Sequence, residues 1–288
     1  MPELTAEIRE RRRHGIGGSD APVVFDQGFS SPFALWAEKV WGREDWTSPF
    51  MQRGHDLEPI VMDKVAARAG VALAEGWWVD HPTVDHMFAN LDAVTPDERP
   101  VELKVIEHRF KGHEWGDDGD PEGVPLNYEI QTRHQMECFD ADEAIVGVLF
   151  VDLWEVRVYE LKRDEQVAAM IVEGERRFWE DHVIPKVMPP VTDGPSAWDA
   201  LRELCARPDA SVDLPDDAAD LISEWLAVRA ERLAATKHET ELKAQLAAHL
   251  GDAEYGYLDG DPVVEFINRP GRNRSLKIPN PYQERFHH

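Results

Sequence analysis

The residues that most constrain this chain are two acids and a lysine set in two short apolar runs. Asp92 ends the first run, and after a turn-forming stretch over residues 95–100 the second run carries Glu102 and Lys104. Apolar and β-branched flanks predict two strands joined as a hairpin. Because side chains alternate along a strand, Glu102 and Lys104 share one face while Leu103 points into the core. The hairpin should bring Asp92 beside Glu102.

That arrangement has a chemical consequence. Two neighbouring carboxylates repel each other unless a cation lies between them, and hard oxygen ligands of this kind suit Mg²⁺ or Mn²⁺. Lys104 would then face a nucleophilic water or the charge that develops on a phosphate. These are the residue types that a metal-dependent phosphodiesterase needs. The pattern is short, and a solvated hairpin with ordinary surface charges is the alternative explanation.

Composition bounds the class of protein. A chain of 288 residues can bury a core as one large domain or two smaller ones. It has no apolar run of 18 residues, and its charged N-terminus lacks the apolar segment of a secretion signal. Two cysteines, Cys138 and Cys205, are too few for a disulfide scaffold or a four-cysteine cluster. We expect a reduced cytoplasmic protein.

The net charge of −25 is unusual for a protein that binds DNA phosphates, which generally has a basic surface. Most of the acidic excess follows residue 115. A strongly acidic exterior with local basic patches could still admit DNA into a lined channel. The simpler interpretation is that these acids keep the protein in solution.

Periodicity and turn residues predict a mixed succession of elements. Ser19 or Asp20 can cap a helix after the glycine-rich turn at 15–20, Pro59 suits a first helical position, and prolines interrupt the connector after residue 184. Helices are expected at 3–13, 21–25, 32–42, 58 or 59 to 70, 127–139, 165–183, and, as one helix or a helical hairpin, 216–250. Strands are expected at 77–79, 87–94, 101–106, 144–152, 154–161, 255–258 and 263–268.

The order of these elements, together with six short segments, resembles the YqaJ-like viral recombinase family, relatives of phage lambda exonuclease within the PD-(D/E)XK nuclease superfamily. The resemblance covers about residues 10 to 180. The six segments are RHGIGGSD at 13–20, SPFALW at 31–36, RGHDLEP at 53–59, ANLD at 89–92, ELK at 102–104 and QTRHQM at 131–136.

The resemblance implies an α/β (α+β) fold: a restriction-endonuclease-like core with a mixed central sheet flanked by helices. A nuclease domain over residues 1–190 would precede a helical and β-hairpin extension over 191–288. It also implies a metal-dependent 5′ to 3′ exonuclease that digests one strand of linear double-stranded DNA. The 3′ overhangs would serve a phage single-strand annealing protein, and the enzyme would be a homo-oligomeric ring, with a trimer as first expectation, encoded by a phage and active in the bacterial cytoplasm.

The resemblance also implies roles for particular residues. Asp92, Glu102 and Lys104 would form the catalytic core, and Glu58 with the backbone carbonyl of Leu103 would complete the ligands of two Mg²⁺ ions, for which Mn²⁺ could substitute. Without the family, Glu58 is better explained as an acid that the dipole favours near a helix start, and with the family a metal role is favoured.

Two further features of the family bear on the site. Gln131 would lie beside the metals, and the family often carries a second glutamine where Arg133 stands here. Ser19 with either Arg12 or Arg13 would hold a terminal 5′ phosphate, although arginines in such a run are usually a solvated helix face.

Other interpretations stay open at this point. A RecB-like or restriction-type endonuclease would use the same catalytic residues, and a non-catalytic acidic protein could mimic DNA or recruit a partner. Trp115 could stack on an unpaired base or serve as a buried anchor; we assign the other tryptophans to the core. His134 has no His or Cys partner at metal spacing, which favours a packed residue over a zinc ligand.

Overall fold

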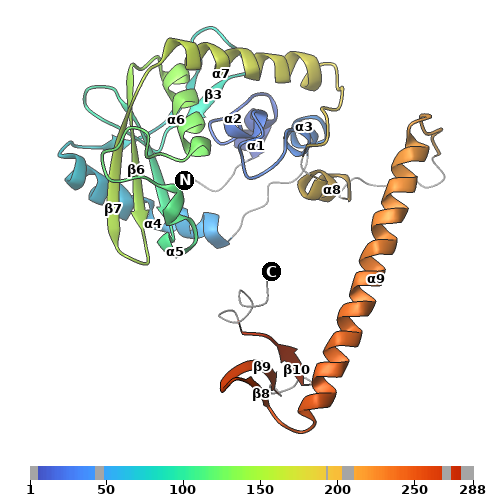
Figure 1. The fold of residues 1–288 in the computed structure, drawn as a ribbon. Helices are drawn as coiled ribbons and strands as arrows, with labels where there is room; N and C mark the ends of the chain where they lie inside the picture. The colour runs from blue at the N-terminus through green and yellow to red at the C-terminus, as the bar shows by residue number, and fades with distance from the viewer. Residues whose placement is uncertain (1–5, 43–48, 193, 203–210, 268–273, 280–288) are drawn as a thin grey trace. The chain divides into compact units, whose positions relative to one another are not determined.

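A computed structural model describes residues 6–42, 49–192, 194–202, 211–267 and 274–279. The chain divides into two compact units, Met1–Ala206 and Arg207–His288 (Figure 1). The sequence placed the domain boundary at residue 190, within the same proline-rich connector. In the described ranges, no helix is both long enough and apolar enough to cross a membrane.

The first unit holds most of the regular structure. Its helical segments are α1 (Ala6–Arg13), α2 (Ala21–Val24), α3 (Pro32–Trp41), α4 (Pro49–Ala69), α5 (His108–Lys111), the 3-10 turn η1 (Gly112–Glu114), α6 (Leu126–Phe139), α7 (Glu165–Arg177), the π-helical η2 (Phe178–Val183) and α8 (Gly194–Arg202). Its strands are β1 (Ala74–Glu75), β2 (Trp78–Asp80), β3 (Phe88–Asn90), β4 (Ala93–Val94), β5 (Pro100–Ile106), β6 (Glu143–Phe150) and β7 (Glu155–Lys162).

Five strands form a central sheet in the order β1-β4-β5-β6-β7 (Figure 1). β5 and β6 run parallel, whereas β1–β4, β4–β5 and β6–β7 are antiparallel. A separate antiparallel pair joins β2 to β3. The predicted mixed central sheet flanked by helices is therefore confirmed.

Alternation along β6 shows how the two faces of the sheet are covered. Ile145 and Leu149 pack with Val61 and Val65 of α4, on one face. Gly147 lies on that face too, and a Cβ there would stand 2.4 Å from Val65, so glycine permits the close approach of α4. Val146 and Val148 belong to the other core, with Tyr128 and Met136 of α6. The sheet is thus sandwiched between α4 and α6.

Helix α4 corrects one expectation. It begins by Pro49 and contains Pro59 in its interior, so the predicted start at Glu58 or Pro59 is wrong. The first position is held by Pro49. Leu57 packs on the same core as Val61 and Val65, so the apolar face keeps helical spacing on both sides of Pro59. The loss of one backbone donor at Pro59 is the cost of this continuity.

The N-terminal helices form a satellite core beside the sheet. α3 has the predicted extent, with Ser31 accepting a hydrogen bond from the Ala34 amide and Gly42 closing the helix in the left-handed conformation. Trp36 is buried and donates from Nε1 to the carbonyl oxygen of His182, at 2.9 Å. Helix α8, within the connector that the sequence left irregular, adds Ala197 and Ala200 to this core.

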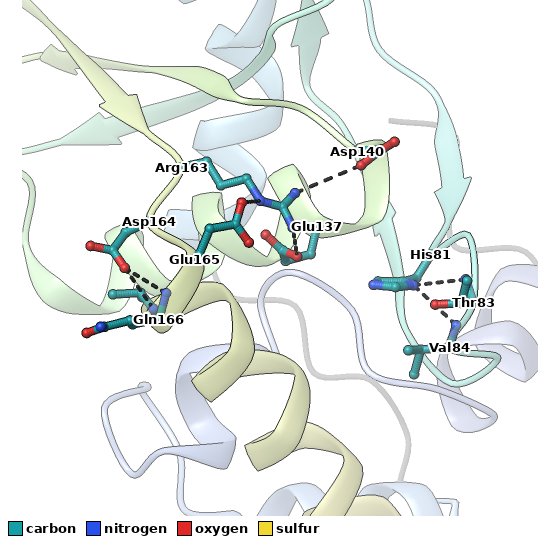
Figure 2. A network of polar contacts seen from close by, with 10 residues as sticks. His81, Thr83, Val84, Glu137, Asp140, Arg163, Asp164, Glu165 and Gln166 are labelled. Atoms are coloured by element: carbon teal, nitrogen blue, oxygen red, sulfur yellow. Dashed lines mark hydrogen bonds and ion pairs between the residues drawn. The ribbon is translucent and has the colours of Figure 1, made fainter.

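Arg163 ties the end of α6 to the start of α7 (Figure 2). Its guanidinium donates to Glu137 at 2.9 Å and also pairs with Asp140 and Glu165. Beside it, Asp164 caps α7 by accepting from the amides of residues 166 and 167. Elsewhere in the same view the His81 ring accepts the amide of Thr83, at 3.1 Å, within the turn that leads to β3. The contacts of Arg163 hold the end of α6, the helix that carries part of the site.

The second unit is built from one long helix and a small sheet. α9 (Ala218–Leu250) is a single helix, which decides against the helical hairpin, and it contains no buried residue. Strands β8 (Tyr255–Leu258) and β9 (Asp261–Ile267) form the predicted hairpin around Asp259-Gly260. A third strand that the sequence did not predict, β10 (Ser275–Lys277), pairs with β9.

The assignment of the other tryptophans to the core is wrong for several of them. Trp36 is buried, but five others lie at the surface because they occupy helix ends, turns or the long helix of the second unit. The exposed ones are Trp41, Trp77, Trp154, Trp198 and Trp225. Trp46 falls outside the described residues.

Candidate active site

A cavity of about 370 Å³ opens where β5, α6, α4 and the glycine-rich turn meet. Its lining includes most of the side chains that the sequence singled out, drawn from segments far apart in the chain. The lining residues used below are Arg12, Ser19, Glu58, Asn90, Asp92, Glu102, Leu103, Lys104, Gln131 and Gln135.

The β4–β5 hairpin places the two acids as predicted. Ala93 pairs with Val101, so Asp92 and Glu102 follow at the next register position. One Asp92 oxygen accepts a hydrogen bond from the Leu103 amide, at 2.9 Å, which extends the hairpin through a side chain where β4 has ended. Leu103 itself packs into the core on the α4 face. The expected alternation along this strand is confirmed.

Glu102 is almost completely buried, and its carboxylate is surrounded by donors. Gln131 donates to one oxygen at 2.8 Å, Gln135 donates to the other, and the Lys104 ammonium pairs with the carboxylate. The Gln131 carbonyl oxygen in turn accepts from Lys104 at 3.2 Å. The predicted place of Gln131 beside the acids therefore agrees with the structure.

Gln135 is the residue that sequence reasoning missed. It stands four residues after Gln131, and positions four apart lie on the same face of a helix, so this spacing was the available signal. Arg133, where the family often has glutamine, turns away from the site. It pairs with Glu129 at 2.8 Å and donates to the carbonyl oxygen of Lys162.

Charges in the cavity affect one another. Burial, together with the nearby Glu102 carboxylate, raises the pKa of Asp92 well above its usual value, and the opposing effects of Lys104 and the Leu103 amide do not cancel this. For Lys104, burial works against the ammonium, but the carboxylates of Glu102 and Asp92 outweigh it and raise the pKa. In this structure Lys104 is therefore a cation and a donor.

The glycine-rich turn brings the predicted phosphate-binding residues to the cavity and separates the two arginines. Arg12 and Ser19 line the cavity. Arg13 instead pairs with Glu10 at 3.7 Å, and its guanidinium lies against Gly42 at the end of α3, where a Cβ would stand 2.8 Å away. Of the two alternatives that the sequence left open, the geometry favours Arg12.

A buried ion pair between Lys39 and Asp20 holds the glycine-rich turn in place. The fully buried Lys39 ammonium donates to Asp20 and to the carbonyl oxygen of Arg12, each at 2.7 Å. Asp20 begins α2, but its side chain does not cap that helix and accepts instead from the Gly17 amide, at 3.1 Å. Burial opposes the charge on Asp20, yet Lys39 and Arg12 outweigh it and lower its pKa.

We expect Lys39→Met to destabilise the protein by about 3–5 kcal/mol, because removing one partner leaves a buried charge uncompensated. The double variant Asp20→Asn/Lys39→Met should recover much of this loss. Unfolding in urea, followed by circular dichroism, measures the free energy of unfolding of each protein. A double variant no more stable than the single one would contradict this account of the pair.

His134 anchors α6 to β3 and α7. Its ring is fully buried, with Nε2 at 2.8 Å from the carbonyl oxygen of Phe88 and Nδ1 at 2.8 Å from Glu175. Burial disfavours the imidazolium, but Cys138 and Glu175 outweigh it and raise the pKa of His134 well above its usual value. It is a packed residue that holds α6 against β3 and α7.

Of the two alternatives for Trp115, base stacking or a buried anchor, the structure supports the buried anchor. Its side chain is 5% exposed and stacks on Tyr128, with ring centroids 5.3 Å apart. It is therefore not placed to stack on a base.

The donor set can be tested for a metal ion. Within the described part of the chain, no group of three or more His, Cys, Asp or Glu side chains is arranged to hold one. Glu58, Asp92 and Glu102 nevertheless line one cavity as hard oxygen donors, with the Lys104 ammonium on Glu102. The buried Oε1 of Gln135 also lacks a hydrogen-bond partner among the described residues. The residue types fit a divalent cation.

The raised pKa of Asp92 gives a prediction about stability. Between the unfolded value of 3.8 and the raised folded value, the folded chain holds more protons than the unfolded chain, so stability falls as pH rises through this window. Asp92→Asn keeps an acceptor for the Leu103 amide and removes the charge. Without added metal it should raise the melting temperature at pH 8 by about 2–4 °C and have little effect at pH 3. Equal shifts at both pH values in thermal scans would contradict this explanation.

Solved structures share the fold around this site. The alkaline exonuclease LHK-Exo from Laribacter hongkongensis superposes with a TM-score of 0.52 and 21% identity, over 64% of this chain and 94% of that one. Its complex with dAMP gives a TM-score of 0.53 at the same identity and coverage. This chain therefore has the α/β fold of that exonuclease.

Sequence comparison shows what the chain is similar to. The YqaJ-like viral recombinase domain matches residues 8–142. A Bacillus subtilis (strain 168) relative, uncharacterized protein YqaJ, is 26% identical over 259 residues, 86% of this chain and 78% of that protein. The YqaJ-like viral recombinase model thus matches the part of the chain that holds the site, and the resemblance seen in the sequence is confirmed.

Proposed function

We propose that this chain is a metal-dependent exonuclease that digests one strand of linear double-stranded DNA from the 5′ end and leaves 3′ overhangs. The observation that carries the proposal is the convergence of Asp92, Glu102 and Lys104 in one cavity that Arg12 also lines. The YqaJ-like recombinase domain and the shared fold with an alkaline exonuclease support it.

Asp92 and Glu102 would hold Mg²⁺ or Mn²⁺, together with Glu58 and the backbone carbonyl of Leu103. When bound, one or two such ions supply Lewis-acid activation of water and neutralise the leaving 3′ oxygen. Lys104 donates hydrogen bonds, so we assign it to orienting the attacking water, to helping it lose a proton and to stabilising phosphate charge.

Gln131 and Gln135 position Glu102. Each amide nitrogen donates to a different oxygen of that carboxylate, so the Glu102 side chain is fixed in orientation. Asn90 stands at the end of β3 and also lines the cavity. These amides give a rigid donor set, which reduces the reorganisation that a reacting phosphate requires.

The polarity of digestion would come from the glycine-rich turn. Arg12 carries a permanent charge with a forked donor geometry that suits phosphate, and Ser19 adds a hydroxyl. Both line the same cavity as the acids, so a terminal 5′ phosphate held there places a phosphodiester of the same strand near Lys104.

Three DNA substrates test the proposal: a linear duplex with a 5′ phosphate, the same duplex with a 5′ hydroxyl, and closed circular plasmid, each with Mg²⁺ and with EDTA. Selective loss of the phosphorylated linear duplex, dependent on Mg²⁺, is expected. Nicking of the circle would indicate a restriction-type or RecB-like endonuclease instead. No cleavage of any DNA would indicate the non-catalytic binding protein.

The proposal extends to assembly. We propose a homo-oligomeric ring, with a trimer as first expectation, that delivers 3′ overhangs to a phage single-strand annealing protein. The acidic net charge is consistent with a ring whose exterior repels DNA. Light scattering that shows a fully active monomer would remove this part of the proposal.

A further inference from the structure

An exposed aromatic ring with a lysine over its face is linked through one side chain to Lys104, which lines the cavity. Phe29, in the loop between α2 and α3, is 71% exposed. The Lys111 ammonium, from α5, stands 4.2 Å from the centroid of its ring. Two segments far apart in the chain therefore contribute one aromatic and one cationic side chain to a single spot on the surface.

Buried rings connect this spot to the reaction centre. The centroid of the Phe29 ring lies 6.1 Å from that of the Tyr128 ring. The Lys104 ammonium lies 5.0 Å from the centroid of the same Tyr128 ring. Tyr128 is buried and stacks on the buried Trp115. A single packed side chain thus separates Phe29 from the catalytic lysine, and the ring has a fixed support.

The charge at this spot is available to a ligand. Among the residues that the structure describes, no carboxylate pairs with Lys111, whose ammonium contacts the Phe29 ring. The neighbouring Arg109 differs, because Glu107 accepts from its Nε at 2.9 Å and neutralises it.

We infer that Phe29 and Lys111 form a nucleotide subsite for the strand being cut. An unpaired base stacks on the Phe29 ring, and Lys111 contacts the phosphate of the same nucleotide, close to the phosphodiester at Lys104. Rings and lysines in this combination bind single strands with little sequence preference, since every base has a face to stack. The inference rests on the proposed function for the identity of the ligand, single-stranded DNA.

Binding measures the subsite without cleavage. Fluorescence anisotropy of a labelled single-stranded 12-mer, in EDTA and low salt, gives the Kd of the full-length protein. Phe29→Leu keeps the volume and removes the aromatic face, so Kd should rise about tenfold. Phe29→Tyr should restore it. Lys111→Gln should raise Kd about threefold and reduce the slope of log Kd against log salt by about 0.7, the contribution of one phosphate contact.

A matched control comes from the second unit. Trp225 is 61% exposed, with the Arg229 guanidinium 5.7 Å from its ring, so it offers the same pairing elsewhere in the chain. Trp225→Leu should leave Kd unchanged. A tenfold loss in this variant as well would show that any exposed aromatic contributes and would overturn the subsite. Because Phe29 is exposed, its variants should melt with the wild-type protein, and a lower melting temperature would count against a binding role.

Abasic oligonucleotides test the stacking itself. A single abasic position, moved along the 12-mer, should weaken wild-type binding most at one place. There the loss should not add to that of Phe29→Leu, because ring and base form one contact. Additive losses at every position, or no wild-type binding at all, would overturn the inference. Cleavage is scored separately: a wild-type protein that binds through Phe29 but degrades no DNA would refute the proposed function and leave the subsite standing.

Discussion

Replacing Lys104 by alanine should lower the rate of Mg²⁺-dependent DNA hydrolysis by about 10²–10⁴-fold. Lys104 carries its charge beside the Glu102 carboxylate and donates to Gln131, so the variant removes the cation that contacts the acids of the cavity. The loss should appear in kcat, because the contact is made to the reacting phosphate and water rather than to remote parts of the DNA. Steady-state digestion of a 5′-phosphorylated duplex measures it.

Lys162→Ala is the control for this variant. Lys162 is 78% exposed at the end of β7 and pairs loosely with Glu143, at 3.6 Å. The Lys162→Ala variant removes a lysine side chain that does not line the cavity, and it should retain full activity. Circular dichroism should show both variants folded. If Lys104→Ala kept more than a tenth of the wild-type kcat, the catalytic assignment would fail.

Arg12→Ala and Arg13→Ala form a matched pair with the second-largest expected difference. A charge-assisted contact to a terminal phosphate contributes about 1.5–3 kcal/mol, which corresponds to about 10–100-fold in kcat/KM. Arg12→Ala should lose this factor on 5′-phosphorylated duplexes. Arg13→Ala should lose little, since that guanidinium lies between Glu10 and Gly42 rather than in the cavity.

The ratio of rates on 5′-phosphorylated and 5′-hydroxyl duplexes is the readout. It cancels general losses of activity, because both substrates meet the same catalytic residues. Arg12→Ala should bring this ratio close to one, whereas Arg13→Ala should preserve it. The reverse result would show that Arg13, and not Arg12, contacts the 5′ phosphate.

Much of the site could be predicted because it depends on local rules. Alternation along one strand is enough to place Glu102 and Lys104 on a shared face, and a hairpin of this length places Asp92 beside them. Gln135 also had a local signal, its spacing of four residues from Gln131. The start of α4 depends on tertiary packing instead, because Pro59 suits a helix start and only the packing of Leu57 on the core of Val61 and Val65 shows that the helix begins earlier.

The sequence also could not distinguish Arg12 from Arg13 as the phosphate-binding residue. Neighbouring residues at the end of a helix point in directions about 100° apart, and the sequence does not say which direction meets the cavity. The buried Lys39 decides it by holding the carbonyl oxygen of Arg12. Lys39 lies on a helix whose pattern predicted only an aromatic core face, so its role depends on a contact between α1 and α3.

The central place of β5 in the sheet affects how activity is lost when the protein unfolds. β5 lies between β4 and β6, and its residues from Val101 to Ile106 all pair in register with β6. Strands of this kind exchange their amide hydrogens with solvent only when the whole domain opens, whereas edges and loops exchange through local fraying. Glu102 and Lys104 therefore lie on the most protected backbone, and heating should disrupt their arrangement and unfold the domain in a single event.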